Sequence, residues 1–136
     1  MVFFDTNIYI YVVSAAVADQ RKKHIAQRLI ADEDFGLSVQ VLQEFMHVTL
    51  RKQELGLTRD EISRMIHFMA EYPVVETTVS LARKAFDLKH SYQISYWDAA
   101  ILAAAQELNC DILYTEDLNH GQNYDGVEVN NPFLAP

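Results

Sequence analysis

Short apolar runs alternate along this chain with much longer segments of helical character, and this alternation constrains the fold more than any other feature. The expected strands are Val2–Phe4, Phe35–Leu37, Val74–Glu76, Asp111–Tyr114 and Val127–Val129. Short apolar strands joined by helices are typical of parallel sheets that are covered on both faces. The sequence therefore predicts an α/β fold with a central parallel sheet.

The segments between these strands carry the end signals of helices. Ser38 and Ser95 are placed to cap the helices that follow them. Thr58 and Glu61 have capping-box spacing, and Pro73 ends the helix before it. The predicted helices are 8–18, 19–31, 39–53, 58–71, 78–90 and 95–108, and 115–125 is predicted to be a loop. No repeat or linker divides the 136 residues, so one domain spanning 1–136 is expected.

Composition excludes several classes of protein. Half of the residues are hydrophobic and 22% are charged, which suits a packed core rather than a disordered chain. No apolar run approaches the ~18 residues of a membrane helix, and residues 1–5 lack the features of a signal peptide. Cys110 is the single cysteine, which excludes an internal disulfide. We expect a cytoplasmic protein with no membrane partner.

The distribution of charge matters more than the net charge of −8. Every lysine and arginine falls between Arg21 and Lys89, so Asp5, Asp98 and Asp117 lie in stretches without a fixed cation. Such acids are well suited to attract a metal ion. The alternative is that the acidic ends of the chain are simply solvated.

Two of these acids follow expected strands. Asp5 ends the first strand, and Asp117 follows the strand 111–114 together with Thr115. Ligands of parallel α/β sheets bind at the carboxyl ends of strands, so we expect these acids to converge there if both strands are central. Asn7 could orient a neighbouring carboxylate. Asp5 is also a good helix N-cap, and Asp117 could belong to an ordinary turn, with Glu116 as the adjacent rival.

Glu44 and Asp98 lie on expected helices. Glu44 shares an apolar stripe with Val41, Phe45 and Val48, where an unpaired charge is costly. It therefore needs a cation, which is either a metal ion or an arginine such as Arg51 or Arg28. Asp98 stands three residues after Ser95, as in a capping box, but the helix beyond it is apolar on nearly every side. Its carboxylate is thus expected to enter a site with little water.

The combined motifs resemble the PIN domain family. The matching segments, in order, are Val2–Asn7, Glu44, Tyr96–Ile101 and Leu113–Leu118. The short length, the segment His120–Gln122 and the closing Asn131–Phe133 most resemble the VapC type of toxin ribonuclease. This resemblance implies a three-layer α/β/α domain that acts as a Mg²⁺- or Mn²⁺-dependent endoribonuclease on tRNA, rRNA or mRNA. It also implies a homodimer and a small antitoxin that reaches into the acidic site.

The resemblance carries the catalytic acids over to Asp5, Glu44, Asp98 and Asp117, with Asn7 and Thr115 as supporting polar residues. Oxygen ligands suit Mg²⁺ and Mn²⁺ independently of any resemblance. Our hypothesis makes Asp5 and Asp98 the primary ligands, with Asp117 binding directly or through water. Glu44 positions the nucleophilic water or shares a second metal.

Three alternatives remain open at this stage. A PIN scaffold could bind RNA or a partner without catalysis, and an RNA-processing nuclease would need no antitoxin. A phosphatase or phosphoryl-receiver domain also places an Asp after its first strand, but it normally uses a late lysine, and none follows Lys89.

Overall fold

Six strands form one sheet in the order β3-β2-β1-β4-β6-β5. The computed structural model describes residues 1–135. All neighbouring strands run parallel except β5 and β6, which are antiparallel. The strands are β1 (Val2–Phe4), β2 (Phe35–Ser38), β3 (Val74–Val75), β4 (Ile112–Tyr114), β5 (Asn123–Tyr124) and β6 (Val127–Asn130). The predicted central parallel sheet is confirmed, with β1 and β4 as direct neighbours.

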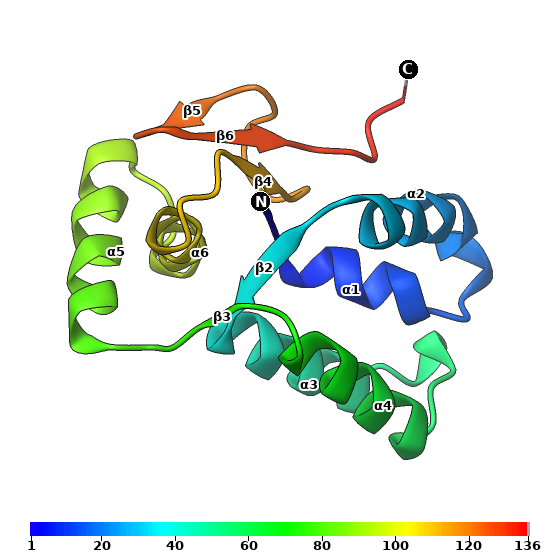
Figure 1. Cartoon of the computed structure of the whole chain (residues 1–136). Coiled ribbons are helices and arrows are strands. Elements are labelled where there is room, and N and C mark those ends of the chain that lie inside the picture. Colours follow the sequence, from blue (N-terminus) through cyan, green and yellow to red (C-terminus); the bar gives the residue numbers. More distant parts are fainter. Residues whose placement is uncertain (136) are drawn as a thin grey trace.

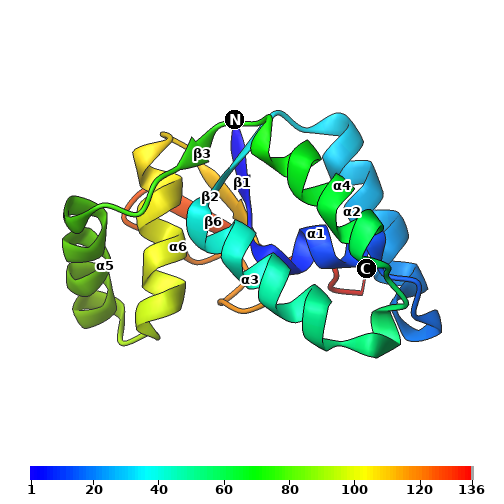
Figure 2. The same cartoon turned by 90° about the horizontal axis from the view of Figure 1, so that it is seen from below.

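Six helices cover the sheet. They are α1 (Thr6–Val13), α2 (Gln20–Asp32), α3 (Val39–Arg51), α4 (Arg59–Ala70), α5 (Val79–Tyr92) and α6 (Tyr96–Glu107). Helices α5 and α6 pack against each other on one side, whereas α1 contacts α2 and α3, and α3 contacts α4, on the other side (Figures 1 and 2). This arrangement is the layered α/β/α architecture that the sequence predicts. Within residues 1–135, no helix is both long and apolar enough to cross a membrane.

The core joins the central strands to α6 and also to α1, α3 and α4. Phe3, Phe4 and Leu113 are fully buried, and every residue of α6 from Ala99 to Ala105 is buried. The alanine side chains of α6 are small, so this helix can pack closely against both the sheet and α5 without leaving voids. The close approach extends to Gly36 in β2, where an added Cβ would collide with the side chain of Leu108.

Three parts of the chain differ from the sequence prediction. The first helix is α1, not 8–18: Asp5 caps its start at Thr6, and the helix ends at Val13. Ser14 then turns the chain and donates a hydrogen bond of 2.6 Å to Asp19, which closes the short 3₁₀ helix Val17–Asp19. A second 3₁₀ helix, Gln53–Leu55, follows the end of α3.

The segment 115–125 is not only a loop, because β5 lies within it. Asp125 and Gly126 both have positive φ, 50° and 97°, and they form the two-residue turn between β5 and β6. An Asp-Gly pair is among the strongest short-range signals for such a hairpin. The sequence therefore held the information for this strand, and the prediction of a plain loop was wrong there.

Candidate active site

Asp5 lies at the carboxyl end of β1 and is almost completely buried, with 5% of its surface exposed. Its Oδ1 accepts a hydrogen bond of 2.7 Å from the backbone N–H of Thr6, and its Oδ2 accepts one of 2.7 Å from the hydroxyl of Thr115. Burial raises the pKa of Asp5 to about 7, and the charges of Asp117 and Glu44 add to the rise. The two hydrogen bonds act in the opposite direction but do not offset the burial.

Glu44 is joined to Asp5 through Thr6. The hydroxyl of Thr6 donates a hydrogen bond of 2.8 Å to Glu44 Oε2, while the backbone N–H of the same residue serves Asp5. On the other side, Gln40 Nε2 donates to Glu44 Oε1 at 2.8 Å. Glu44 is thus held by neutral donors at both oxygens, and neither donor supplies a compensating positive charge.

No arginine neutralises Glu44. Among residues 1–135, the ion pairs are Lys22–Glu116 and Lys84–Glu107, so Arg28 and Arg51 do not act as its structural partners. The same observation holds for Asp5, Asp98 and Asp117. The four acids therefore share a region of negative charge without a protein cation.

Asp98 lies in the first turn of α6, where Ser95 caps the helix. The Ser95 hydroxyl accepts a hydrogen bond of 3.0 Å from the backbone N–H of Asp98. Only half of the expected capping box forms within the described chain, because the Asp98 carboxylate accepts no return bond from the backbone N–H of Ser95. Burial is the largest cause that raises the pKa of Asp98; the contact of its carboxyl group with the Ser95 side chain lowers it, and the charge of Glu44 raises it. The carboxylate is therefore available to a ligand.

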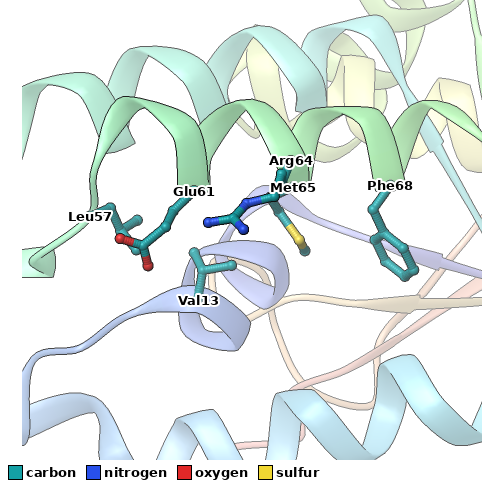
Figure 3. A pocket seen from close by; sticks show the side chains of 6 residues that line it. All are labelled: Val13, Leu57, Glu61, Arg64, Met65 and Phe68. Carbon is teal, nitrogen blue, oxygen red and sulfur yellow. The ribbon is translucent and has the colours of Figure 1, made fainter.

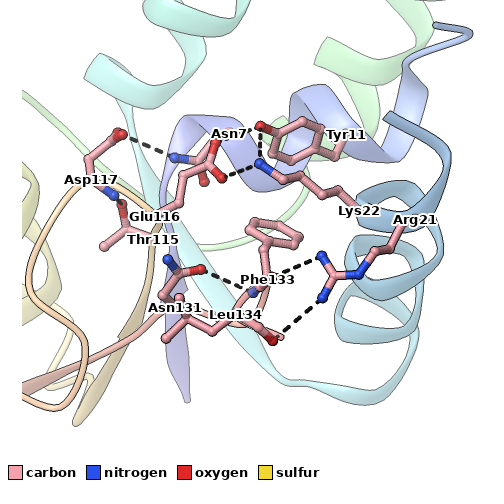
Figure 4. A network of polar contacts seen from close by, with 10 residues as sticks. All are labelled: Asn7, Tyr11, Arg21, Lys22, Thr115, Glu116, Asp117, Asn131, Phe133 and Leu134. Carbon is pink, nitrogen blue, oxygen red and sulfur yellow. Dashed lines mark hydrogen bonds and ion pairs between the residues drawn. The ribbon is translucent and has the colours of Figure 1, made fainter. Parts of the chain in front are cut away.

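Asp117 approaches the site from the segment after β4. Asn7 Nδ2 donates to Asp117 Oδ2 at 3.3 Å, and the Asp117 backbone N–H donates to the Thr115 hydroxyl at 3.1 Å (Figure 4). Burial raises the pKa of Asp117, and the charges of Asp98, Glu116 and Glu44 raise it further. Thr115 thus contacts both Asp5 and Asp117, and the expectation that these residues lie together at the sheet edge agrees with the structure.

Glu116 faces away from this group. It accepts a hydrogen bond of 2.5 Å from the Tyr11 hydroxyl and forms an ion pair of 2.8 Å with Lys22 (Figure 4). The Lys22 ammonium also lies 4.9 Å from the centre of the Tyr11 ring, and Phe133 packs edge-on against that ring. The carboxylate of Glu116 is therefore paired with Lys22 and Tyr11, whereas the neighbouring Asp117 has no cation partner among residues 1–135.

The basic segment at the start of α2 also serves structure. Arg21 donates to the carbonyl oxygen of Phe133 at 2.9 Å, and Lys23 donates to that of Ser14 at 2.8 Å. Together with Lys22, these side chains anchor the closing segment and the end of α1. They are thus engaged with the protein itself.

The donor set fits a hard divalent cation in kind. Carboxylate oxygens are the ligands that Mg²⁺ and Mn²⁺ prefer. In addition, Asn7 Oδ1 is buried and has no hydrogen-bond partner among residues 1–135, so one polar atom at the site is left unsatisfied by the protein. As the side chains stand, no three Asp, Glu, His or Cys residues in the described chain are close enough to hold an ion. Binding therefore needs carboxylates to move toward one another.

Two residues of this site were missed by sequence reasoning. Thr6 links Asp5 to Glu44, and Gln40 links Glu44 to the carbonyl of Trp97, which precedes Asp98. Gln40 had a usable signal, because it stands one helical turn before Glu44. Thr6 had none beyond its place between Asp5 and Asn7.

The hollow between α1 and α4 is separate from these acids. It has a volume of about 350 Å³ and is lined by Val13, Leu57, Glu61, Arg64, Met65 and Phe68 (Figure 3). The carboxylate in this hollow, Glu61, completes a capping box with Thr58. Glu61 therefore has a structural role in α4. The candidate active site is the group of acids near the carboxyl ends of β1 and β4.

The model of the PIN domain family matches residues 2–125 of this chain. No curated protein matches the chain in sequence.

Several solved structures share the fold. A toxin–antitoxin complex from Klebsiella pneumoniae superposes with a TM-score of 0.72 and 19% identity, covering 98% of both chains. The VapC20 toxin of Mycobacterium tuberculosis, described as cleaving the sarcin-ricin loop, has a TM-score of 0.67 and 19% identity over 86% of this chain and 90% of that one. The DNA-bound VapBC complex of Salmonella typhimurium has a TM-score of 0.67 and 14% identity, over 97% and 99%.

Proposed function

Because this chain belongs to the PIN domain family, we propose that it is a metal-dependent endoribonuclease and the toxin of a type II toxin–antitoxin pair. Support for the nuclease comes from the family and from the acidic site. Support for the toxin comes from the neighbouring folds, several of which are toxin–antitoxin complexes. A cytoplasmic homodimer that is blocked by a small antitoxin is part of the same proposal.

One observation carries the catalytic part of the proposal. Asp5 is buried with its pKa raised to about 7, beside Glu44 and Asp117, and none of these acids has a cation partner among residues 1–135. Capping of α1 requires Asp5 alone, and it does not explain why Glu44 and Asp117 lie beside this residue. Perturbed carboxylates grouped in this way are typical of functional sites.

Each acid has a role that follows from its position. Asp5 and Asp98 would be the primary ligands of Mg²⁺ or Mn²⁺, with Asp117 binding directly or through water. The metal, when bound, supplies positive charge that polarises the phosphodiester and offsets the charge that develops on it. Glu44 is less buried than Asp5 and is held at both oxygens, so it is placed to orient the attacking water and receive its proton.

The supporting residues keep the acids in place. Thr115 donates to Asp5 and accepts from the backbone of Asp117, so one hydroxyl fixes the relative positions of the two acids. Thr6 performs the same task between Asp5 and Glu44. Asn7 donates to Asp117 and leaves its own Oδ1 for a water or substrate group.

The test uses a panel of structured RNAs with the purified protein. Cleavage should require added Mg²⁺ or Mn²⁺ and should stop when the metal is chelated. Asp98→Ala should abolish cleavage and keep the fold, because Asp98 is only partly buried. The matched control is Glu128→Gln, an exposed acid on β6 opposite the first residue of β4, which should cleave normally.

Other outcomes separate the alternatives. RNA binding without cleavage under any metal condition would favour a non-catalytic PIN scaffold. Full activity in Asp98→Ala, or in Asp5→Ala, would overturn the assignment of the acids. The toxin role is tested by co-expressing the small protein encoded beside this chain, if one exists: it should co-purify and block cleavage. Cleavage without such an inhibitor would favour an RNA-processing nuclease.

A further inference from the structure

A recessed cavity of about 220 Å³ lies beside the candidate active site, between α3, α5 and the first turn of α6. Two aromatic residues, two amides and apolar side chains line it, among them Tyr96, Trp97, Gln40, Gln43, Leu81 and Ala100. At ~30 Å³ for each water in the liquid, this space equals roughly seven waters. Its size is therefore on the scale of one aromatic ring system.

Trp97 forms the exposed edge of this cavity. It is the single tryptophan of the chain, and 64% of its surface is accessible. Its ring meets Tyr96 edge-on, at 5.1 Å between centroids and 83° between planes, so a face of the indole is not stacked on a protein ring. Trp97 also directly precedes Asp98. A ligand on the indole would thus lie next to the acidic site.

Gln40 connects the cavity to the acids. Its Nε2 donates to Glu44 at 2.8 Å and to the Trp97 carbonyl oxygen at 3.1 Å, so both amide hydrogens are in use. Within residues 1–135, no group donates to Gln40 Oε1. The side chain can therefore offer one acceptor to a ligand, in an orientation that Glu44 and Trp97 fix.

We propose that this cavity receives one unstacked nucleobase of the RNA substrate, which stacks on Trp97 and donates an exocyclic amino hydrogen to Gln40 Oε1. The inference rests on the proposed function, because it places the base beside the phosphodiester that the acids would cleave. Proteins commonly read single-stranded RNA in this way, by stacking a splayed base on an aromatic ring and bonding its edge.

The chemistry of the cavity favours a base over a second copy of the chain. An aromatic wall beside oriented amides matches the two features of a base, its flat face and its polar edge. A protein interface would gain from the exposed apolar side chains of Trp97, Val79 and Phe86 and would not need the fixed acceptor of Gln40. The Gln40 acceptor should also discriminate among bases. Adenine, cytosine and guanine carry an exocyclic amino group that can donate to it, and uracil does not.

The first experiment follows nucleoside binding by the fluorescence of the protein, which reports on Trp97 alone among tryptophans. Neutral nucleosides are used with a chelator present, so neither cleavage nor repulsion between phosphate and carboxylates enters the result. Cytidine and adenosine should quench the emission saturably. Their matched partners, uridine and inosine, replace the amino group by a carbonyl and should bind about 5- to 10-fold more weakly.

Two variants test the assignment of the residues. The emission of Gln40→Leu should still be quenched by nucleosides, but the variant should lose the preference for cytidine over uridine. A merely structural role of Gln40 would not change the ratio of these two affinities. In RNA cleavage, Trp97→Ala should raise KM on the order of tenfold with little change in kcat, and Trp97→Phe should restore most of the loss. Leu50→Ala, an exposed apolar control on α3, should leave both parameters unchanged.

The outcomes separate this inference from the proposed function. Nucleoside quenching without any RNA cleavage would support the cavity and overturn the nuclease. Cleavage without quenching, with an unchanged KM in Trp97→Ala, would overturn the cavity alone. Equal quenching by all four nucleosides would overturn the role of Gln40. A second copy of the chain is the other possible occupant. It would be indicated if the Trp97 emission shifted to the blue as the protein formed a dimer and if nucleosides did not change that emission. This result would overturn the inference.

Discussion

The hydroxyl of Thr115 donates a hydrogen bond of 2.7 Å to Oδ2 of Asp5, although 110 positions separate the two residues. Both residues are buried, and each directly follows one of the adjacent parallel strands β4 and β1. The second oxygen of Asp5 caps α1 through Thr6. The capping role and the site role of Asp5 are therefore compatible, because each uses a different oxygen of one carboxylate.

Burial of Asp5 predicts that the metal-free protein loses stability as pH rises. The pKa of Asp5 is raised from 3.8 to about 7, so its contribution to stability is complete below about pH 4 and is lost as pH rises toward 7. The shift corresponds to at most about 4 kcal/mol, since one pKa unit equals about 1.4 kcal/mol. Asp5→Asn, which cannot ionise, should be more stable than the natural protein at pH 8, with a difference that shrinks toward pH 4.

Urea unfolding in the presence of a chelator, at several pH values, measures this difference. Comparing the variant with the natural protein at each pH cancels the contributions of the other acids. Glu128→Gln serves as control and should follow the natural protein throughout. An Asp5→Asn variant that is equally stable at pH 8 would show that the Asp5 carboxylate is solvated or paired in solution.

Metal binding should restore the stability that ionised Asp5 costs. At 100 times its Kd, a ligand that binds only the folded state adds about 2.7 kcal/mol. Because the ligands must be ionised, Mn²⁺ should raise the Tm more at pH 8 than at pH 6. Asp98→Asn should lose most of this rise, and Glu128→Gln should keep it. An equal rise in both variants would place the metal away from Asp98.

The order of elements made part of this site predictable from sequence. Asp5 and Asp117 each follow an apolar run, and parallel strands that are neighbours bring such residues to one edge. The apolar stripe around Glu44 similarly indicated that its carboxylate needs a partner that compensates its burial. These inferences rest on local patterns, which the sequence displays directly.

The contacts that assemble the site have no such pattern. Thr6 meets Glu44 across 38 positions, and Lys22 meets Glu116 across 94. The first pair depends on how α1 packs against α3, and the second on how the segment after β4 meets α2. Periodicity within a segment does not encode that packing. Arg28 and Arg51 were reasonable partners for Glu44 by the same local logic, and the packing brings neither into an ion pair with it.

Asp117 and Glu116 offer a matched pair of neighbours for a test of catalysis. Asp117→Asn should lower the cleavage rate roughly 10- to 100-fold, because it removes a charge from the proposed metal site. Glu116→Gln should stay within a few-fold of the natural rate, since Glu116 bonds Tyr11 and Lys22 instead. Initial rates at saturating metal measure both. A larger loss in Glu116→Gln would transfer the role to Glu116.

The network around Glu116 predicts coupled stability effects. Tyr11→Phe removes a hydrogen bond to a charged acceptor and should lower the free energy of unfolding by roughly 1–2 kcal/mol. Lys22→Met should cost less, about 0.2–1 kcal/mol, because the two side chains of its ion pair remain 35% and 23% exposed. Since both partners hold the same carboxylate, the double variant should depart from additivity by about 0.5 kcal/mol or more.

Urea unfolding of the two single variants and the double variant at pH 7 completes this cycle. Lys84→Met is the matched control, because its ion pair with Glu107 is about half exposed, at 51% and 49% of the side-chain surfaces, and should contribute less than about 0.5 kcal/mol. Strict additivity of Tyr11→Phe and Lys22→Met would mean that Glu116 does not bind both partners at once in solution. In that case α1 and α2 would not jointly anchor the segment that carries Asp117, and Asn7 and Thr115 alone would hold this acid at the site.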